Sequence, residues 1–226
     1  MKITIEIHPA EGGDDAKALV SVQESIYKKY AVRHSLKFKS EYQGPICFIS
    51  IDGPDNLTSQ LLKEAGGHRW QRVPPNERKG RIHTSAVTVA VFESDTIKQV
   101  MPDIKPSEIV ERVTRGTGPG GQSRNKRETA IVLKHIPTGI EVKSECERTQ
   151  DANRKLAMAE LTKRVTSAIL SEKKNDVDST RKAQLGGGAR GDKIRSYRSD
   201  GVIDHITNRK VQLTDILAGK LELLYA

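Results

Sequence analysis

The sequence predicts a protein of the α+β class, and three observations support this. The chain opens with a period-two run, Ile3-Thr4-Ile5-Glu6-Ile7, which is typical of a half-buried strand, and short runs that resemble strands recur further along. Helical spacing is confined to a few segments, the longest of which begins near Thr149. Pro102 and Pro106 interrupt the pattern and mark an expected domain boundary.

The first part of the chain is expected to form strands and short helices. Gly12-Gly13 end the opening strand, and a helix is expected to follow with apolar positions near helical spacing: Leu19, Val20, Ile26 and Tyr27. Further elements are expected as strands at 36–38 and 46–51, a short helix at 57–64, and strands at 68–73 and 82–92. The polar, proline-stiffened loop 74–80 joins the last two strands, and such exposed loops often carry recognition residues.

The second part predicts a small hairpin-and-helix domain around a glycine-rich loop. Strands are expected at 108–114, 129–135 and 140–145, with the loop at 115–125. The long helix that follows has an expected inner face of Leu156, Ala157, Ala159, Leu161 and Val165. From about Ser179 the chain becomes basic and glycine-rich, and it ends with an expected strand at 201–206 and a helix at 214–224.

Charge and composition exclude several classes of protein. The 226 residues carry a net charge of +9, of which residues 111–226 hold +8 (23 basic, 15 acidic). This concentration near flexible glycines favours contacts with phosphate groups. No apolar stretch is long enough to span a membrane, and the N-terminus lacks the apolar region of a signal peptide. Cys47 and Cys146 have no metal-ligand spacing, so neither a disulfide framework nor a metal site is expected. No cofactor is expected either. The protein is expected to be cytoplasmic, where thiols stay reduced.

The most informative segment is the glycine loop Arg115-Gly116-Thr117-Gly118-Pro119-Gly120-Gly121-Gln122-Ser123-Arg124-Asn125-Lys126. It lacks the Gly-Lys-Ser/Thr of a Walker loop and the strand-loop-helix setting of a dinucleotide fingerprint. Together with its surroundings it resembles the class I peptide chain release factors, in a UAA/UAG-like subtype. The resembling segments run nearly end to end: 68–74, 80–86, 135–140, 147–150, 179–181, 204–205 and 219–221.

The resemblance implies the reaction and the group that promotes it. The ester joining a finished polypeptide to its tRNA is hydrolysed, and negative charge develops on the carbonyl oxygen. The resemblance assigns the stabilising donor to the backbone N–H of Gln122, with Gly120 and Gly121 permitting the geometry. It also implies N5-methylation of Gln122 by a release-factor glutamine methyltransferase. His135 is expected to be structural rather than a general base, and Trp70 a core residue.

The resemblance also implies residues that read a stop codon. Gly12 and Asp15 would contact the first base, His83 would stack on the second, and the remaining positions would complete the reading: Gln71, Pro74, Pro75, Asn76, Thr84 and Thr88. The triplet Pro74-Pro75-Asn76 departs from the Pro-any-Thr of the UAA/UAG subtype and the Ser-Pro-Phe of the UGA subtype, but Asn76 keeps a polar side chain. UAA and UAG remain the expected codons.

The expected partners are 16S and 23S ribosomal RNA, the messenger stop codon and peptidyl-tRNA, and a monomer is expected. RNA phosphates would be contacted by basic residues beside the two glycine-rich loops: Arg115, Arg124, Lys126, Arg127, Arg181, Arg190, Lys193, Arg195 and Arg198. The expected two-lobed architecture has a codon-recognition domain at 1–105, a hydrolysis domain at 106–177 and a segment at 178–226 that completes the first lobe. The helical N-terminal domain of full-length bacterial members is expected to be missing.

Two alternatives remain open at this point. A codon-independent ribosome-rescue factor would share the Gly-Gly-Gln domain, but such factors use a basic tail, whereas this chain ends Leu221-Glu222-Leu223-Leu224-Tyr225-Ala226. A non-catalytic protein that occupies the ribosomal A site would not need the intact Gly120-Gly121-Gln122. A release assay distinguishes both from a termination factor.

Overall fold

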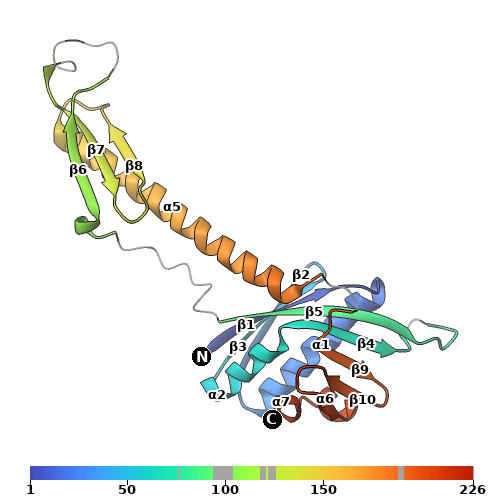
Figure 1. Cartoon of the computed structure of the whole chain (residues 1–226). Coiled ribbons are helices and arrows are strands. Elements are labelled where there is room, and N and C mark those ends of the chain that lie inside the picture. The colour runs from blue at the N-terminus through green and yellow to red at the C-terminus, as the bar shows by residue number, and fades with distance from the viewer. Residues whose placement is uncertain (76, 94–103, 118–120, 122–125, 188–190, 226) are drawn as a thin grey trace. The chain divides into compact units, whose positions relative to one another are not determined.

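The structure is a computed structural model that describes residues 1–75, 77–93, 104–117, 121, 126–187 and 191–225 (Figure 1). The chain divides into two compact units, with residues 1–98 and 177–226 in unit 1 and residues 99–176 in unit 2. The boundary at residue 177 falls inside one continuous helix, α5 (Gln150–Leu185). In the part of the chain that is described, no helix combines the length and apolar character needed to cross a bilayer.

Unit 1 is built on an eight-stranded sheet in the order β11-β10-β9-β4-β5-β1-β3-β2. Neighbouring strands are antiparallel except β4 and β9, which are parallel. The strands are β1 (Lys2–Pro9), β2 (Lys37–Gln43), β3 (Ile46–Asp52), β4 (Gly66–Arg72), β5 (His83–Glu93), β9 (Arg195–Arg198), β10 (Gly201–Asp204) and β11 (Lys210–Val211). Two short helical turns, α2 (Asp55–Thr58) and η1 (Ser59–Glu64), connect β3 to β4.

The core of unit 1 lies between this sheet and helix α1 (Asp14–Arg33). The three isoleucines of β1 that the period-two pattern places on one face, Ile3, Ile5 and Ile7, are buried, whereas the central strand β5 is buried continuously over residues 85–92. The predicted apolar positions of α1 are also buried: Leu19, Val20, Ile26 and Tyr27. Trp70 is 4% exposed and stacks on Tyr197 with ring centroids 4.1 Å apart, so its predicted place in the core is confirmed.

Unit 2 consists of a three-stranded antiparallel sheet packed against the first part of α5. Its strands are β6 (Ile109–Thr114), β7 (Ala130–His135) and β8 (Glu141–Ser144), preceded by the short η2 (Pro106–Glu108). Ala157, Leu161 and Val165 of α5 pack on Ile131, Leu133 and Val142 of the sheet. Leu156 and Ala159 were also expected on this inner face, but both are exposed because α5 covers only one side of a three-stranded sheet and buries a narrow stripe.

The C-terminal segment differs most from the sequence prediction. Instead of one helix over 214–224, two short helices occur, α6 (Leu213–Leu217) and α7 (Glu222–Tyr225). Gly219 separates them with φ +82°, a conformation that L side chains rarely adopt, and the backbone of Lys29 and Tyr30 lies where its Cβ would be. Strand β9 lies in the tract that is predicted only as basic and glycine-rich, and β11 lies between the expected strand at 201–206 and the expected helix.

A buried ionic centre ties this C-terminal segment into unit 1. Arg195 is 0% exposed and donates to Glu64, also 0% exposed, and to Asp204 at 3.0 Å. The hydroxyl of Tyr225 also donates to Glu64. Glu64 and Arg195 are 131 positions apart in the sequence. A buried ion pair between them therefore joins η1 to β9.

Candidate functional site

Three distant segments of unit 1 meet at one end of the β4–β5 hairpin. In the register of the two strands, Gln71 lies opposite Thr84, and Arg72 lies opposite His83. The side chains of each pair share one face of the hairpin, and the two pairs lie on opposite faces. The first turn of α1 lies beside Arg72, whose Nη2 donates to Asp15 Oδ1 at 2.8 Å. Asp15, Gln71, His83 and Thr84 therefore lie at the same end of the hairpin, with Gln71 and Thr84 on one face and with His83, Arg72 and its partner Asp15 on the other.

Gly12 holds the turn between β1 and α1 close to β5. Its φ is +131°, and a Cβ at this position would lie 2.5 Å from Ser85 Oγ. The chain on either side is bound to β5 by backbone hydrogen bonds, from the N–H of Ala10 to Ala86 O at 3.0 Å and from the N–H of Ala86 to Glu11 O at 2.7 Å. Only glycine combines this φ with so close an approach. The first turn of α1 is consequently fixed against the end of the hairpin.

Only one of the two carboxylate oxygens of Asp15 is hydrogen-bonded within the described part of the chain. Its side chain is 8% exposed, and Arg72 binds one of its oxygens. The other oxygen, Oδ2, is buried and has no hydrogen-bond partner among the described residues. A buried acceptor without a donor is costly, so Oδ2 is suited to accept a hydrogen bond from a bound group.

Glu77 organises the loop between β4 and β5. Its carboxylate accepts the backbone N–H of Lys79 at 2.8 Å and Nη2 of Arg81 at 3.0 Å, and it bonds His83 Nε2 at 2.8 Å. The hydrogen bond from Lys79, followed by the one from Arg81, lowers the pKa of Glu77 below its ordinary value. The loop therefore has an ionised carboxylate at its centre, which orients the half-exposed ring of His83.

The predicted loop residues differ in exposure. Pro75 is exposed, whereas Pro74 is buried and its carbonyl accepts the N–H of Glu77 at 3.0 Å. The Pro74 ring thus supports the loop from inside, and its expected part in codon recognition stays a prediction. Asn76 lies outside the described residues. Ile82, which precedes His83 in the sequence, is 72% exposed.

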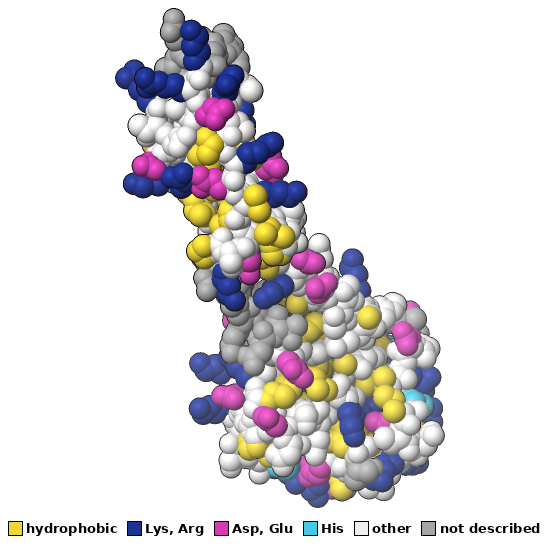
Figure 2. All heavy atoms as spheres, turned by 60° about the vertical axis from the view of Figure 1, so that its left-hand side comes forward, with side chains coloured by type: hydrophobic (Ala, Val, Ile, Leu, Met, Phe, Trp, Pro, Cys, Tyr) yellow, Lys and Arg dark blue, Asp and Glu magenta, His cyan; other side chains and the backbone are white. Residues whose placement is uncertain are grey.

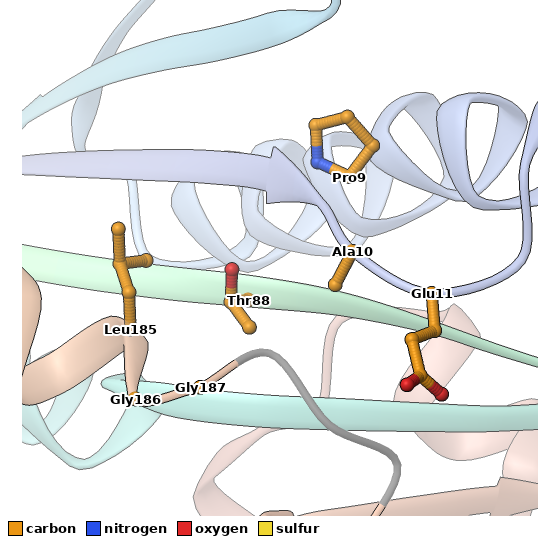
Figure 3. A pocket seen from close by; sticks show the side chains of 7 residues that line it. All are labelled: Pro9, Ala10, Glu11, Thr88, Leu185, Gly186 and Gly187. Atoms are coloured by element: carbon orange, nitrogen blue, oxygen red, sulfur yellow. The ribbon is translucent and has the colours of Figure 1, made fainter.

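Thr88 does not belong to this group. It lies four residues further along β5 than Thr84, about 13 Å away at a strand rise of roughly 3.3 Å per residue. It is 5% exposed and forms part of the wall of a pocket of about 350 Å³ (Figure 3). The pocket is lined by Pro9, Ala10, Glu11, Thr88, Leu185, Gly186 and Gly187. The predicted codon contact of Thr88 is therefore wrong, and Thr84 is the threonine that faces Gln71.

A basic cluster lies beside Gln71 on the same face of the sheet. Arg69 Nη2 donates to Ser196 Oγ at 3.1 Å, and Ser196 Oγ lies 2.9 Å from His205 Nε2. Partial burial of the ring, then the charges of Lys193 and Arg69, lower the pKa of His205. The Nε atoms of Arg69 and Arg198 are buried without a hydrogen-bond partner in the described part of the chain. These unsatisfied donors suit an anionic ligand.

Two of the predicted phosphate contacts are not available for that role. Arg195 is fully buried in the ionic centre with Glu64 and Asp204, so its predicted contact with RNA is wrong. Arg181 places both Nε and Nη2 on Glu6 at 2.8 Å and also contacts Asp178. These carboxylates already neutralise its charge. Net charge along a sequence does not show which arginines are buried, as Arg195 is, or paired with carboxylates, as Arg181 is.

The glycine loop of unit 2 emerges between the end of β6 and the start of β7. Gly121 is exposed, whereas Gly120, Gln122 and Arg124 lie outside the described residues, as does Arg190 of unit 1. Figure 2 shows Lys and Arg side chains gathered at the end of unit 2 that carries this loop. The described members of this group are exposed: Arg115, Lys126 and Arg127. Arg115 is held only loosely, with its Nε 3.7 Å from Glu128.

His135 is the last residue of β7 and lies at the end of this strand away from the glycine loop. His135 is 3% exposed and its Nδ1 bonds Thr138 Oγ1 at 2.8 Å, which confirms the expected structural role. Groups of His, Cys, Asp or Glu that could hold a metal ion are not found in the described ranges.

The comparisons with known proteins agree with this arrangement. The PCRF domain matches residues 1–89 and the RF-1 domain matches residues 96–205. Peptide chain release factor 1 of Baumannia cicadellinicola subsp. Homalodisca coagulata is 37% identical over 97% of this chain and 62% of its own length. The chain belongs to the class I peptide chain release factor family.

Solved structures give the same architecture. RF2 of Thermus thermophilus superposes with a TM-score of 0.54 at 29% identity, covering 99% of this chain and 66% of the other. The predicted α+β release-factor architecture is thereby confirmed. A shorter match to the mitochondrial disease-related protein C12orf65 covers 29% of this chain and 57% of the other, at 42% identity and a TM-score of 0.24. This chain therefore spans less than two thirds of the length of the first two relatives.

Several residues of the site escaped sequence reasoning. Glu77 was seen only as part of a polar loop, and Arg72 and Arg69 only as parts of a resembling segment. One signal was available for Glu77, since a carboxylate followed within six residues by Lys79, Arg81 and His83 has several possible partners nearby. No local sequence pattern predicts the pairing of Arg72 with Asp15, because the two residues are 57 positions apart.

Proposed function

We propose that this chain is a translation termination factor that recognises a stop codon in the ribosomal A site and promotes hydrolysis of peptidyl-tRNA. The single observation that carries this proposal is the convergence of Asp15, Gln71, His83 and Thr84 at one hairpin end. Asp15 offers a buried acceptor, Oδ2, that has no partner among the described residues. Gln71 and Thr84 place polar groups on one face of the hairpin, and His83 places a half-exposed imidazole on the other. Such a set suits hydrogen bonding to base edges and stacking on one base.

The hydrolytic step is assigned to Gly120, Gly121 and Gln122. The backbone N–H of Gln122 donates to the developing oxyanion, and this interaction is stronger in the transition state than in the ground state. Among the described residues, nothing lies within 4 Å of a Cβ at Gly121, and its φ lies outside the left-handed region. The described part of the chain therefore leaves room for a side chain at this position, so we attribute the requirement for glycine to the RNA that the loop approaches.

UAA and UAG are the proposed codons. Gln71 and Thr84 face each other across the hairpin, and both can donate and accept hydrogen bonds. Asn76 and Pro75 would complete the reading from the loop. Each correct hydrogen bond contributes roughly 1 to 3 kcal/mol of discrimination, because a wrong base leaves a desolvated group unpaired.

The proposed partners follow from this role. The messenger and 16S ribosomal RNA would face unit 1, with Lys193 and Arg198 on phosphates, and 23S ribosomal RNA and peptidyl-tRNA would face the glycine loop. Arg115, Lys126 and Arg127 would contact phosphates beside the loop, together with Arg124. Methylation of Gln122 by a glutamine methyltransferase, action as a monomer and a cytoplasmic location are part of the same proposal.

Peptide release from purified ribosomes tests the proposal. The chain should release peptide with UAA or UAG in the A site and not with a sense codon or a truncated message. Gly121→Ala should abolish release while leaving ribosome binding nearly intact, and Gly187→Ala, where a Cβ also meets open space, should change neither. Equal release on sense codons or truncated messages would favour a rescue factor, and binding without release on any codon would favour a non-catalytic A-site protein.

A further inference from the structure

The N-terminal stem of the glycine loop is clamped by β8 and the residue that follows it. Thr117, five positions before Gln122, donates its backbone N–H to Glu145 Oε2 at 3.0 Å. Its hydroxyl lies 3.1 Å from both oxygens of the same carboxylate. Lys143 Nζ donates to that hydroxyl at 3.1 Å and pairs with Glu145 at 2.7 Å. One carboxylate therefore binds the backbone and the side chain of a single loop residue.

The C-terminal stem of the loop is held by the start of α5. Gln150 Nε2 donates to Glu128 O at 2.6 Å, and Asn153 Nδ2 donates to Thr129 O at 2.9 Å. Asn153 is 0% exposed, and its other hydrogen bonds bind the backbone of Glu147 and the hydroxyl of Ser144. The segment from β8 to the first turn of α5 thus anchors both stems of the loop.

The two anchors differ in kind. The hydrogen bonds of Asn153 are buried and form part of the core of unit 2, whereas Glu145 lies at the surface with its side chain 23% exposed. The Glu145 contacts are not needed to fill the core. These contacts fix the position of Thr117, where the chain leaves the sheet before Gly118.

We propose that Glu145 is a positioning residue for the reaction loop, holding Thr117 so that the backbone N–H of Gln122 meets the developing oxyanion. This inference rests on the proposed function. The segment 116–121 contains four glycines and therefore constrains its own backbone weakly. A loop of this kind depends on its stems for direction, and a misplacement of about 1 Å at a reacting group can reduce a rate roughly a hundredfold.

The clamp is present across the working pH range. The hydrogen bond from Lys143, followed by the one from the Thr117 backbone, lowers the pKa of Glu145 to about 2. The carboxylate therefore remains charged at every pH at which ribosomes work. The clamp is a permanent support rather than a pH switch, and the proposed role predicts no Glu145-dependent change in the pH profile of release.

The first test compares Glu145→Ala with Glu111→Ala in the full chain. Glu111 is a matched control because it lies in unit 2, is 33% exposed and binds Arg154 at 2.7 to 3.0 Å away from the glycine loop. Glu145→Ala should lower the maximal rate of peptide release about tenfold without changing the ribosome concentration at half-maximal rate. Glu111→Ala should leave both parameters unchanged, and equal rates in the two variants would overturn the inference.

Thr117 supplies the complementary test. Thr117→Val removes the hydroxyl at nearly constant shape and should lower the maximal rate, whereas Thr117→Ser keeps the hydroxyl and should restore it. Amide hydrogen exchange at Thr117 provides a readout that needs no ribosome, and it should be faster in Glu145→Ala than in Glu111→Ala. Unchanged exchange overturns the clamp itself. Absence of release by the unmodified chain, with exchange accelerated as expected, would instead contradict the proposed function.

Discussion

Arg72 and Asp15 join the end of β4 to the first turn of α1 through a hydrogen bond of 2.8 Å. Both side chains are largely buried, with exposed fractions of 24% and 8%. The bond connects two segments that the resemblance assigned to stop-codon reading, the one that contains Gly12 and Asp15 and the one that contains Gln71. The position of α1 relative to the β4–β5 hairpin therefore depends on this pair.

Removal of the Asp15 carboxylate should weaken codon recognition. Asp15→Ala leaves the guanidinium of Arg72 without its partner and frees the turn, and charge-assisted bonds contribute about 1.5 to 3 kcal/mol. We expect the half-saturating concentration for release on UAA ribosomes to rise roughly tenfold or more. Asp14→Ala is the control, because the exposed Asp14 pairs only with Lys17 in the same turn. Equal effects of the two variants would contradict the role of the Asp15–Arg72 bond.

Neutralising Glu77 should affect discrimination between codons more than the rate of hydrolysis. Glu77→Gln weakens the bonds to Lys79, Arg81 and His83 that hold the loop, so His83 would adopt more orientations. Release on stop codons at saturating factor should change little, while the ratio of stop-codon to near-cognate release should fall several-fold. Glu41→Gln, an exposed glutamate on β2, serves as the control. An unchanged ratio would show that Glu77 does not orient the reading residues.

Acid should destabilise unit 1 through His68. Its Nε2–H donates to Glu64 O at 2.9 Å and its Nδ1 accepts from the Tyr197 hydroxyl at 2.9 Å, so the ring is neutral. Burial lowers the pKa of His68 to about 4 from an ordinary value of 6.5. The folded state then binds fewer protons than the unfolded state, and stability falls as the pH drops from about 6.5 to about 4, by up to about 3 kcal/mol.

The fluorescence of Trp70, the single tryptophan, reports on unit 1 during urea unfolding. The free energy of unfolding should decrease steadily between pH 6.5 and pH 4 in the unmodified chain. His68→Gln, which retains a donor and an acceptor, should show a flatter dependence over this range. The same slope in both proteins would mean that another group titrates.

Arg195 should contribute to stability and not to RNA binding. Arg195→Met leaves Glu64 and Asp204 buried without their cation, and breaking a buried pair in this way costs about 3 to 5 kcal/mol. Urea unfolding followed through Trp70 measures the loss. Lys210→Met removes an exposed ion pair with Asp200 and should cost less than about 1 kcal/mol. Similar losses would argue against a buried ionic centre.

The basic cluster of unit 1 should carry part of the salt dependence of binding. Removal of one phosphate-binding cation lowers the slope of log affinity against log salt by about 1. Arg69→Ala and Arg198→Ala should each reduce this slope for ribosome binding between about 50 and 200 mM salt, and Lys210→Ala should not. A slope that is unchanged in all three variants would exclude the cluster from the interface.

The elements and the family followed from local patterns. The alternation of apolar and polar residues predicted β1, and short strand-like runs predicted the central strands. The Gly12-Gly13 break predicted the start of α1, and the glycine loop with its flanking segments indicated the family. These features depend on neighbouring residues, because strand alternation, helix ends and turns are set by the local backbone. The broken helix at Gly219 lay beyond such reasoning, since the close approach of Lys29 and Tyr30 requires α1 to be in place.

The sequence by itself determined that this protein carries a glycine-rich loop and a polar hairpin loop, since both are contiguous segments with distinctive residues. Only the tertiary structure decided which residues complete them. Arg195 and Arg198 are both arginines of one strand, yet pairing with Glu64 buries the first. Thr84 and Thr88 share a face of β5, yet only Thr84 lies opposite Gln71. Burial and cross-strand register arise from contacts between distant segments, so they appear only when the chain is folded.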